Sequence, residues 1–437
     1  MKINNLFLFA LILFGIKNTA QDHKTLSLKD AVSLVITNSS EANLANTKIL
    51  TSKLELESLK NNQYPSVKIS GEYLRLTGAN VNSKIGGNSS GSSPLEVSQL
   101  LLGQANVAMP LFNGFKLKNN IDASENLYKS QVYTASQTKE ELAVYVVELF
   151  ANLYKAQEML KIFEENSKSA NQRSKDFSAM VDNGLLARND LLKAQLQEST
   201  IQISIETAIK NINIINYQLV TLLHLPEKTI IDIDIETVKK DMAASQLKTV
   251  TAQRNDIEAL IFKQKASESG IKIAKGGYYP SLSLVGGYIA LDLKNVISVT
   301  NAMNFGIGFN YDIASIFKNG KEVELAKSKS LQTQQSLNIL SDKVKEEIQE
   351  ANENYTLSIK QNKVYNQAVE QATENYRIVK DKYDNSLATT TELLEADNQQ
   401  LQSKINFSLS QAEVALKYYQ LQFASGKLIN SFNITLK

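Results

Sequence analysis

The feature that most constrains this chain is a run of about 66 residues, Lys116 to Val181, that contains neither glycine nor proline. Nothing in this run forces a helix to break, and one helix of this length would be roughly 100 Å long. A second run of the same kind extends from Lys321 to Asn385. We therefore expect two long helices that span a distance. The middle of the first carries an apolar stripe with the 4-3 spacing of a coiled coil: Leu142, Val146, Leu149, Leu153, Ala156, Leu160 and Phe163.

The first 20 residues have the pattern of a secretory signal peptide. A short basic start precedes an apolar run from Leu6 to Ile16, and a cleavage site is expected near Ala20. The alternative is a membrane anchor helix, but about 11 apolar residues are too few to span a bilayer. No later segment offers 18 unbroken apolar residues. We therefore expect an exported protein that is either soluble or held in a membrane by strands.

The composition excludes several classes of function. The chain has 47 basic and 45 acidic residues, and the leader holds Lys2 and Lys17, so the mature chain is close to neutral. A nucleic-acid-binding surface is therefore not expected. Cysteine is absent, which rules out disulfides, thiolate metal sites and cysteine nucleophiles. The two histidines, His23 and His224, are far apart in sequence. We expect no catalytic residues, no cofactor and no bound metal.

Four segments alternate apolar and polar residues with the period of a β-strand, at about 66–76, 97–112, 281–291 and 302–313. One face of each strand is apolar, and the opposite face carries glycine, asparagine, glutamine or aspartate. Strands of this kind suit a bilayer, with lipid on one side and water on the other. The alternative is two hairpins that pack on a soluble core. The positions expected to face lipid are Val107, Leu284, Phe305, Ile307, Phe309 and Tyr311.

The chain repeats one unit twice: helix, strand, strand, long helix, turn, helix. For example, Asp182-Asn183 and Leu191-Leu192 match Asp384-Asn385 and Leu393-Leu394. The expected order is a signal peptide over residues 1–20, a first repeat over 21–225, a linker over 226–250, a second repeat over 251–425 and a β-prone tail over 426–437. The hairpin tips are expected at about 182–189 and 384–391, and Gly320 is expected to open the second long helix as Gly114 opens the first.

Four strands cannot close a barrel on their own. Open sheet edges are not tolerated in hydrocarbon, because no water is present there to bond the backbone. If these strands lie in a membrane, several copies of the chain must share one barrel. The residues by themselves do not fix the number of copies.

Several short motifs strengthen this interpretation. They are the two strand starts Tyr64-Pro65-Ser66 and Tyr279-Pro280-Ser281, the run Leu111-Phe112-Asn113-Gly114, and the turn Asp182-Asn183-Gly184-Leu185 followed by Asp190-Leu191-Leu192. With the doubled unit, they resemble the TolC family of outer-membrane efflux proteins over nearly the whole mature chain.

The resemblance implies a mainly α-helical protein with membrane β-strands. Three protomers would each give four strands to a shared 12-stranded β-barrel, and their long helical hairpins would form a periplasmic α-barrel. The segment 226–248 and the C-terminal tail would form an equatorial belt. The implied location is the outer membrane of a Gram-negative bacterium, with a periplasmic helical extension. The implied partners are outer-membrane lipid, a periplasmic adaptor protein and an inner-membrane transporter.

The resemblance also assigns roles to the hairpin tips. Glu392 and Glu395 share one helix face and match acidic positions that line the periplasmic entrance of the pore; the alternatives are a capping box at Thr389 for Glu392 and a solvated helix face for Glu395. A latch between hairpins would use Asp190 and Tyr383, with Arg188 as a substitute for the family arginine that Ala388 replaces. The alternatives are a favourable charge at a helix start for Asp190 and coiled-coil packing for Tyr383. An adaptor is expected to dock at Gly184, Leu185, Leu186, Ser386 and Leu387, and because Ser386 replaces glycine the two tips need not dock alike.

The leading hypothesis is therefore a passive export channel of a tripartite efflux or type I secretion system. The alternative is a secreted coiled-coil scaffold or adhesin whose strands fold in a soluble domain. An enzyme is disfavoured because the sequence offers no nucleophile–base pair, metal-ligand spacing or phosphate loop. The exported substrate and the class of inner-membrane pump are not encoded in any motif.

Overall fold

The structure, a computed structural model, describes residues 23–81, 95–233, 238, 242, 254–294 and 296–434. The expected signal peptide, the glycine- and serine-rich segment over residues 83–93 and most of the linker over 226–250 lie outside the described residues. The described elements are, in order, β1 His23–Thr25, α2 Leu28–Asn38, α3 Ser40–Asn61, β2 Ser66–Val81, β3 Leu95–Asn113, α4 Lys116–Asp182, α5 Arg188–Leu222, β4 Ile230–Asp232, α7 Asn255–Lys275, a 3-10 turn Gly276–Tyr278, β5 Ser281–Leu293, β6 Ile297–Asn310, α8 Ser315–Asp384, α9 Thr390–Ala424 and α10 Leu428–Ser431.

The chain divides into two compact units, each built from several segments. The sheet unit comprises residues 48–133 and 257–339, and the hairpin unit comprises residues 1–47, 134–256 and 340–437. Helices α3, α4, α7 and α8 contribute residues to both units. Each unit is described separately below.

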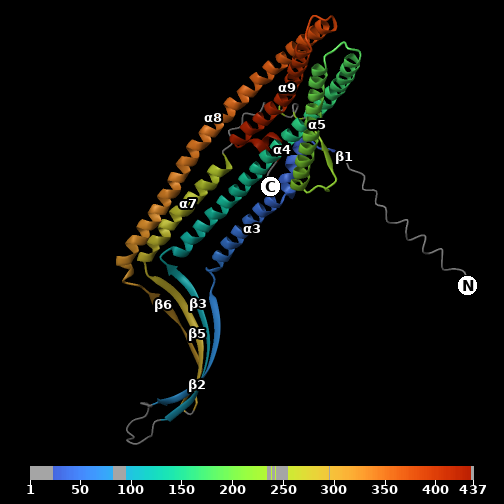
Figure 1. Ribbon diagram of the computed structural model, residues 1–437. Helices are drawn as coiled ribbons and strands as arrows, with labels where there is room; N and C mark the ends of the chain where they lie inside the picture. The colour runs from blue at the N-terminus through green and yellow to red at the C-terminus, as the bar shows by residue number, and fades with distance from the viewer. Residues whose placement is uncertain are drawn as a thin grey trace, which may run out of the picture. The chain divides into compact units, whose positions relative to one another are not determined.

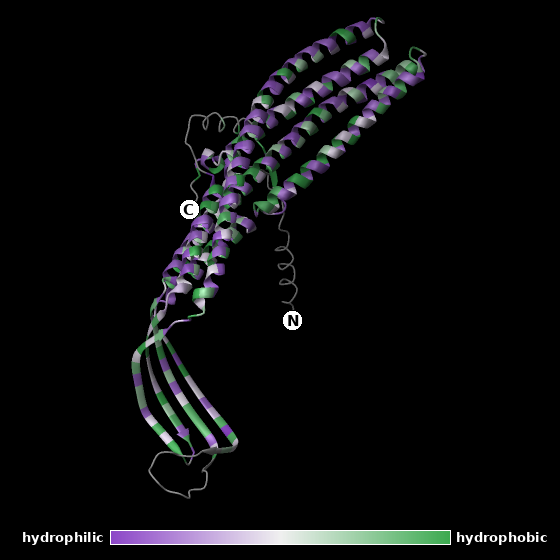
Figure 2. Cartoon of the chain, turned by 90° about the vertical axis from the view of Figure 1, so that its left-hand side faces the viewer, coloured by the Kyte–Doolittle hydropathy of each residue, from purple (hydrophilic) through white to green (hydrophobic). Residues whose placement is uncertain are grey.

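The sheet unit contains the four expected strands, side by side in the order β2-β3-β5-β6 (Figure 1). All three neighbouring pairs are antiparallel, and the join between β3 and β5 links the two halves of the repeat. Hydrophobic and hydrophilic residues alternate along these strands (Figure 2). The β2–β3 pair extends beyond the expected ends, and its register shifts between Arg75 and Ala79.

The register places the expected lipid-facing residues on one face of the sheet. Val107 is opposite Gly286, which is opposite Phe305, and Leu284 is opposite Ile307. Phe309 joins the same face through its pair with Leu282. The other face carries polar cross-strand pairs, such as Lys68 with Asn106 and Gly287 with Asn304. One sheet thus has an apolar face and a polar face across all four strands.

Tyr311 does not belong to this face. The last strand ends at Asn310, so the prediction of a strand up to residue 313 was wrong. The physical reason is Asp312, whose side-chain oxygen accepts a hydrogen bond from the N–H of Ala314 at 3.0 Å. This local turn competes with the sheet and leads the chain into α8.

The two long helices are present, and both are unbroken. α4 has 67 residues and α8 has 70, in agreement with the lack of glycine and proline. The two helices nevertheless begin differently. Gly114 precedes α4 and has a φ of 66°, whereas Gly320 lies inside α8, five residues after its start. The prediction that Gly320 opens the second helix was wrong because the turn at Asp312 already starts the helix at Ser315.

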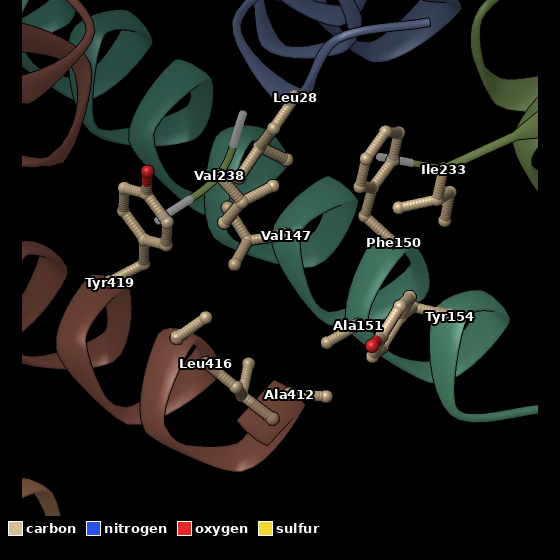
Figure 3. A pocket seen from close by; sticks show the side chains of 11 residues that line it. Leu28, Val147, Phe150, Ala151, Tyr154, Ile233, Val238, Ala412, Leu416 and Tyr419 are labelled. Atoms are coloured by element: carbon tan, nitrogen blue, oxygen red, sulfur yellow. The ribbon is translucent and has the colours of Figure 1, made fainter. Parts of the chain in front are cut away.

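The core of the hairpin unit forms around the predicted coiled-coil stripe. Leu142, Val146, Leu149 and Leu153 are all buried, and they contact residues of α2, α5 and α9 in one continuous cluster. A small apolar cavity lies within this core, between α2, α4, α9 and the segment after β4 (Figure 3). The cavity has no charged lining residue, so it reflects imperfect packing rather than a polar binding site.

The helical segment that precedes the first strand of the repeat is interrupted at Ser39. Ser39 has extended backbone angles between α2 and α3, and its hydroxyl accepts a hydrogen bond from the N–H of Ala42 at 3.1 Å. A serine can end one helix and begin the next in this way because its side chain replaces a missing backbone acceptor.

The C-terminal tail was expected to be β-prone, and this was wrong for residues 428–431, which form α10. Leu428, Ile429 and Phe432 are buried in the core. The N–H of Ile429 donates to the buried carboxylate of Glu140 on α4 at 3.2 Å. Burial of these side chains outweighs their β-propensity. In the described part of the linker, residues 230–232 form β4, which pairs in parallel with β1.

Glu140 should make the stability of the protein depend on pH. Burial raises its pKa from 4.5 to about 7, while the hydrogen bond from Ile429 lowers it. Because the folded protein binds this proton more tightly than the unfolded chain, the contribution of Glu140 to stability is greatest below about pH 4.5 and is lost as the pH rises to about 7. Glu140→Gln should therefore raise the free energy of unfolding at pH 8 by up to about 3 kcal/mol.

Thermal unfolding measured from pH 5 to pH 8 tests this prediction. The matched control is Glu141→Gln, since Glu141 is exposed and accepts only a bond from Gln137. Glu140→Gln should flatten the fall in the unfolding midpoint, and Glu141→Gln should not. Equal pH profiles for the two variants would contradict the assigned role of Glu140.

Candidate functional site

The tips of the two helical hairpins have the same backbone structure. The chain reverses at Gly184 and at Ser386, with φ values of 70° and 61°. In each tip the next residue, Leu185 or Leu387, donates its N–H to a carbonyl five residues earlier, at 2.8 and 2.7 Å. These bonds are the Schellman pattern of a helix C-terminus, which normally uses glycine. The backbone of the two tips is therefore alike despite Ser386, and any difference in docking would have to come from side chains.

The residues expected to dock an adaptor are mostly exposed. Leu185 is 72% exposed and Leu387 is 77% exposed. Leu186 differs, because it is half-buried against the apolar cluster formed by Phe177, Ala194 and Leu393. Each tip thus presents one leucine at its end. Adaptor docking itself stays a prediction.

Glu392 has a structural role at the start of α9. Its carboxylate accepts hydrogen bonds from the N–H of Thr389 at 2.6 Å and from its hydroxyl at 2.9 Å, while the Glu392 N–H donates to that hydroxyl. These bonds form a complete capping box, and the bond from the Thr389 backbone lowers the pKa of Glu392. Glu395, one turn later, is exposed, and its carboxylate accepts a single long hydrogen bond within the described residues, from Gln399 at 3.5 Å. Lining of a pore stays a prediction for both, and Glu395 is less constrained.

The expected latch residues are not bonded to one another. Asp190 forms an ion pair with Lys193 at 3.2 Å, and Lys193 donates to Thr391 of the second hairpin at 3.1 Å. The Tyr383 ring lies 6.0 Å from the Phe177 ring, and its buried hydroxyl has no hydrogen-bond partner among the described residues. Arg188 forms no ion pair within the described part of the chain. The latch role of Asp190, Tyr383 and Arg188 stays a prediction.

A buried polar cluster that the sequence did not reveal joins the two hairpins instead. Arg173 of α4 forms an ion pair with Asp397 of α9 at 3.0 Å, with 9% and 4% of their side chains exposed. Gln197 of α5 accepts from Arg173 at 3.1 Å and donates to Asp397 at 2.8 Å. Burial alone would lower the pKa of Arg173, but the hydrogen bond and charge of Asp397 outweigh burial and raise it, with a smaller contribution from Tyr376 of α8. The cluster therefore contains residues from all four helices of the two hairpins.

The sequence does contain a signal for this cluster. Asp397 lies four residues after Leu393, on a helix face that also carries buried Leu394 and Ala396. Arg173 lies between Ala170 and Phe177 on a buried face of α4. A charge on an apolar helix face predicts an ion pair or a hydrogen-bonded partner. The pairing of these two charges, 224 residues apart, could not be found without the fold.

The comparisons with known proteins identify the family. The profile described as outer membrane efflux protein matches residues 54–223 and 247–427, which together make up most of the chain.

The chain belongs to the outer membrane efflux protein family.

Individual relatives are distant but cover much of the chain. The outer membrane protein TolC of Vibrio cholerae is 22% identical over 360 residues, covering 78% of this chain and 80% of TolC. The outer membrane efflux protein BepC of Brucella suis is 20% identical over 244 residues; this match covers 55% of the chain and only about half of BepC, 53%. The solved CmeC outer membrane channel of Campylobacter jejuni matches with a TM-score of 0.77 and 16% identity, covering 94% of this chain and 90% of that channel. This likeness shows the fold.

Membership in the outer membrane efflux protein family confirms the resemblance drawn from the sequence motifs and the doubled unit. It places the protein in the outer membrane and gives it a role in efflux. Across the described residues, no helix has the length and apolar character needed to cross a bilayer. No group of three or more acidic residues or histidines in that part of the chain is arranged to hold a metal ion.

The Arg173–Asp397 pair yields a prediction about stability. Arg173→Met leaves Asp397 buried and uncompensated, so unfolding should become easier by about 3–5 kcal/mol. The double variant Arg173→Met with Asp397→Leu removes both charges and should recover most of the loss. Thermal or denaturant unfolding in detergent measures both variants.

Arg377→Met is the matched control. Arg377 pairs with Glu374 and Asp381, but it is 60% exposed, so its loss should cost no more than about 1 kcal/mol. If Arg173→Met is as mild as this control, the buried pair does not hold the hairpins together.

Proposed function

We propose that the protein is a passive export duct formed by three copies of the chain. The observation that supports this most strongly is the sheet unit, which has one apolar and one polar face across four strands. Within the described residues β2 and β6 each have one paired side only. Unpaired strand edges in hydrocarbon would cost several kcal/mol for each backbone group. A second copy of the same sheet is the simplest way to pair them.

The directions of the strands suit a closed ring. Each neighbouring pair in the order β2-β3-β5-β6 is antiparallel, so β2 and β6 run in opposite directions. Pairing of β6 with the β2 strand of the next copy therefore continues the antiparallel pattern without a break. Three copies, the number that the family resemblance implies, give a 12-stranded barrel. This is wider than the eight-stranded barrels that side chains fill, so the polar face can surround water.

The helices supply the rest of the duct. At 1.5 Å per residue, α4 and α8 are each roughly 100 Å long, which is long enough to cross much of the periplasm. The exposed Leu185 and Leu387 at the hairpin tips would be the contacts for a periplasmic adaptor, and an inner-membrane transporter would supply the energy. The chain has no need of catalytic residues in this role.

The alternative of a secreted coiled-coil scaffold explains the long helices only. It leaves unexplained why an apolar sheet face with Phe305 and Ile307, 94% and 70% exposed, is left open. It also conflicts with membership in an outer membrane efflux family.

Reconstitution into planar lipid bilayers tests the duct and its entrance. The purified protein should form trimers that conduct ions in discrete steps. Three copies would bring three Glu395 carboxylates around one axis, and such a ring favours cations. Glu395→Gln should therefore reduce the preference for cations, measured as a shift of reversal potential in a salt gradient.

Glu370→Gln, at an exposed position on α8, serves as the control for a general loss of charge. If trimers insert but do not conduct, the proposed duct is wrong. If they conduct and both variants keep the wild-type reversal potential, the duct stands and Glu395 does not line its narrow part.

A further inference from the structure

An apolar groove lies at the start of α4 in the sheet unit, beside the end of α3 that leads into β2. Its lining comes from the end of β3 and the first turns of α4, and it also includes the polar residues Gln63, Asn113, Lys118 and Asp122. Leu111 and Phe115, which line it, are 55% and 57% exposed. The main apolar lining residues are Pro110, Leu111, Phe112, Phe115, Leu117 and Ile121.

The backbone holds this groove open. Gly114 and Phe115 both have positive φ, 66° and 61°, and the left-handed conformation costs phenylalanine about 1 kcal/mol. The Phe115 ring is fixed by edge-to-face contacts with Phe112 at 5.1 Å and Tyr279 at 6.4 Å. Gly114 lies so close to the backbone of Gly276 that no side chain would fit. The Phe115 ring therefore packs against two other aromatic rings at one wall of the groove.

A matching apolar side chain projects beside the opposite edge of the sheet. Phe317, in the first turn of α8, is 84% exposed. The side of α8 that contacts α7 is marked by Asn319, which donates to the carbonyl of Ala274 at 2.7 Å, and by Ser330, which accepts from Gln264 at 3.1 Å. Ala326 lies on that side as well, and Phe317 is nine residues away, half a turn around the helix. Phe317 therefore points away from its own α7.

The groove and Phe317 lie near opposite edges of the sheet, and both lie at the same end of its strands. β2, the strand at one edge of the sheet, begins shortly after Gln63, which lines the groove. β6, the strand at the other edge, leads into α8. Asn113, Ser281 and Asn310 lie in one row across β3, β5 and β6. The groove lies next to Asn113, and Phe317 follows Asn310 by seven residues. If β6 of a sister copy pairs with β2 at a register that keeps its Asn310 level with Asn113, the start of its α8, with Phe317, lies beside this groove.

We propose that the groove of one copy receives Phe317 of the next copy, as an apolar joint directly beside the strand seam. The inference rests on the proposed trimer and adds a specific contact to it. An aromatic ring suits walls made by Phe112 and Phe115, because edge-to-face contacts add to the burial of apolar area. Ile316, 47% exposed beside Phe317, would extend the contact. The joint would fix the position of one sheet against the next.

Cysteine crosslinking between copies tests the contact directly, because the chain has no cysteine of its own. One tagged chain carries Phe317→Cys, and a second chain with a different tag carries Leu111→Cys. The two chains are produced together in the same cells and oxidised in the outer membrane. A covalent product that carries both tags is the expected result. If trimers that contain both tags give no such product, the inference is wrong, while the proposed trimer stands. A phospholipid bound in the groove in place of Phe317 would be the matching result.

A substitution pair measures how much the joint stabilises the assembly. Phe317→Ala should make the trimer dissociate at a lower temperature, with a dissociation constant about tenfold larger for each interface. Leu284→Ala removes an exposed apolar side chain from the same sheet face but on the inner strand β5, away from either edge, and should leave dissociation unchanged. Equal effects of the two variants would overturn the joint. A wild-type protein that stays monomeric in detergent would overturn both the joint and the proposed function.

Discussion

The whole structure depends on one requirement, which is that backbone N–H and C=O groups at a sheet edge in hydrocarbon must find partners. A single chain pairs β2 with β3, β3 with β5 and β5 with β6, and it leaves the outer sides of β2 and β6 without a partner within its described residues. The apolar face of this sheet suits lipid, but its edges do not. Association of identical copies satisfies the edges, encloses the polar face and creates an axis along which a conduit can run. In the proposed trimer, oligomerisation is thus a condition for folding in the membrane as well as for transport.

The hairpin unit meets a different requirement, because its helices must stay together and yet end in exposed tips. Apolar contacts such as that of Phe177 with Leu393 hold the two hairpins together near their tips. The buried Arg173–Asp397 pair fixes how the two hairpins are aligned in this contact. Apolar contacts tolerate sliding, whereas a buried ion pair has one low-energy arrangement. The tips end in Schellman turns that leave Leu185 and Leu387 open. The same structure therefore combines a specified inner contact with an accessible outer surface.

Much of this architecture could be predicted from the sequence, because it depends on local patterns. The absence of glycine and proline predicted α4 and α8, and strict alternation predicted the four strands and their apolar face. The errors arose where a local turn or burial against distant residues decides. Asp312 ends β6 before Tyr311, and burial of Leu428 and Ile429 turns a β-prone tail into α10. At the tips, the capping box of Glu392 was foreseen as an alternative. The Arg173–Asp397 pair was missed because it joins helices far apart in sequence, although each charge lies on an apolar face.

The most direct test of the central claim is to crosslink β2 to β6. One cysteine is placed on the polar face of β2, at Lys68, Ser70 or Glu72, and one on that of β6, at Asn304, Gly306 or Gly308, in the same chain. Within one sheet β2 and β6 are three strand spacings apart, roughly 14 Å, whereas a disulfide needs Cα atoms within about 7 Å. The account predicts that at least one combination yields covalent trimers upon oxidation in the membrane. Monomers without any intermolecular disulfide across all combinations would contradict it.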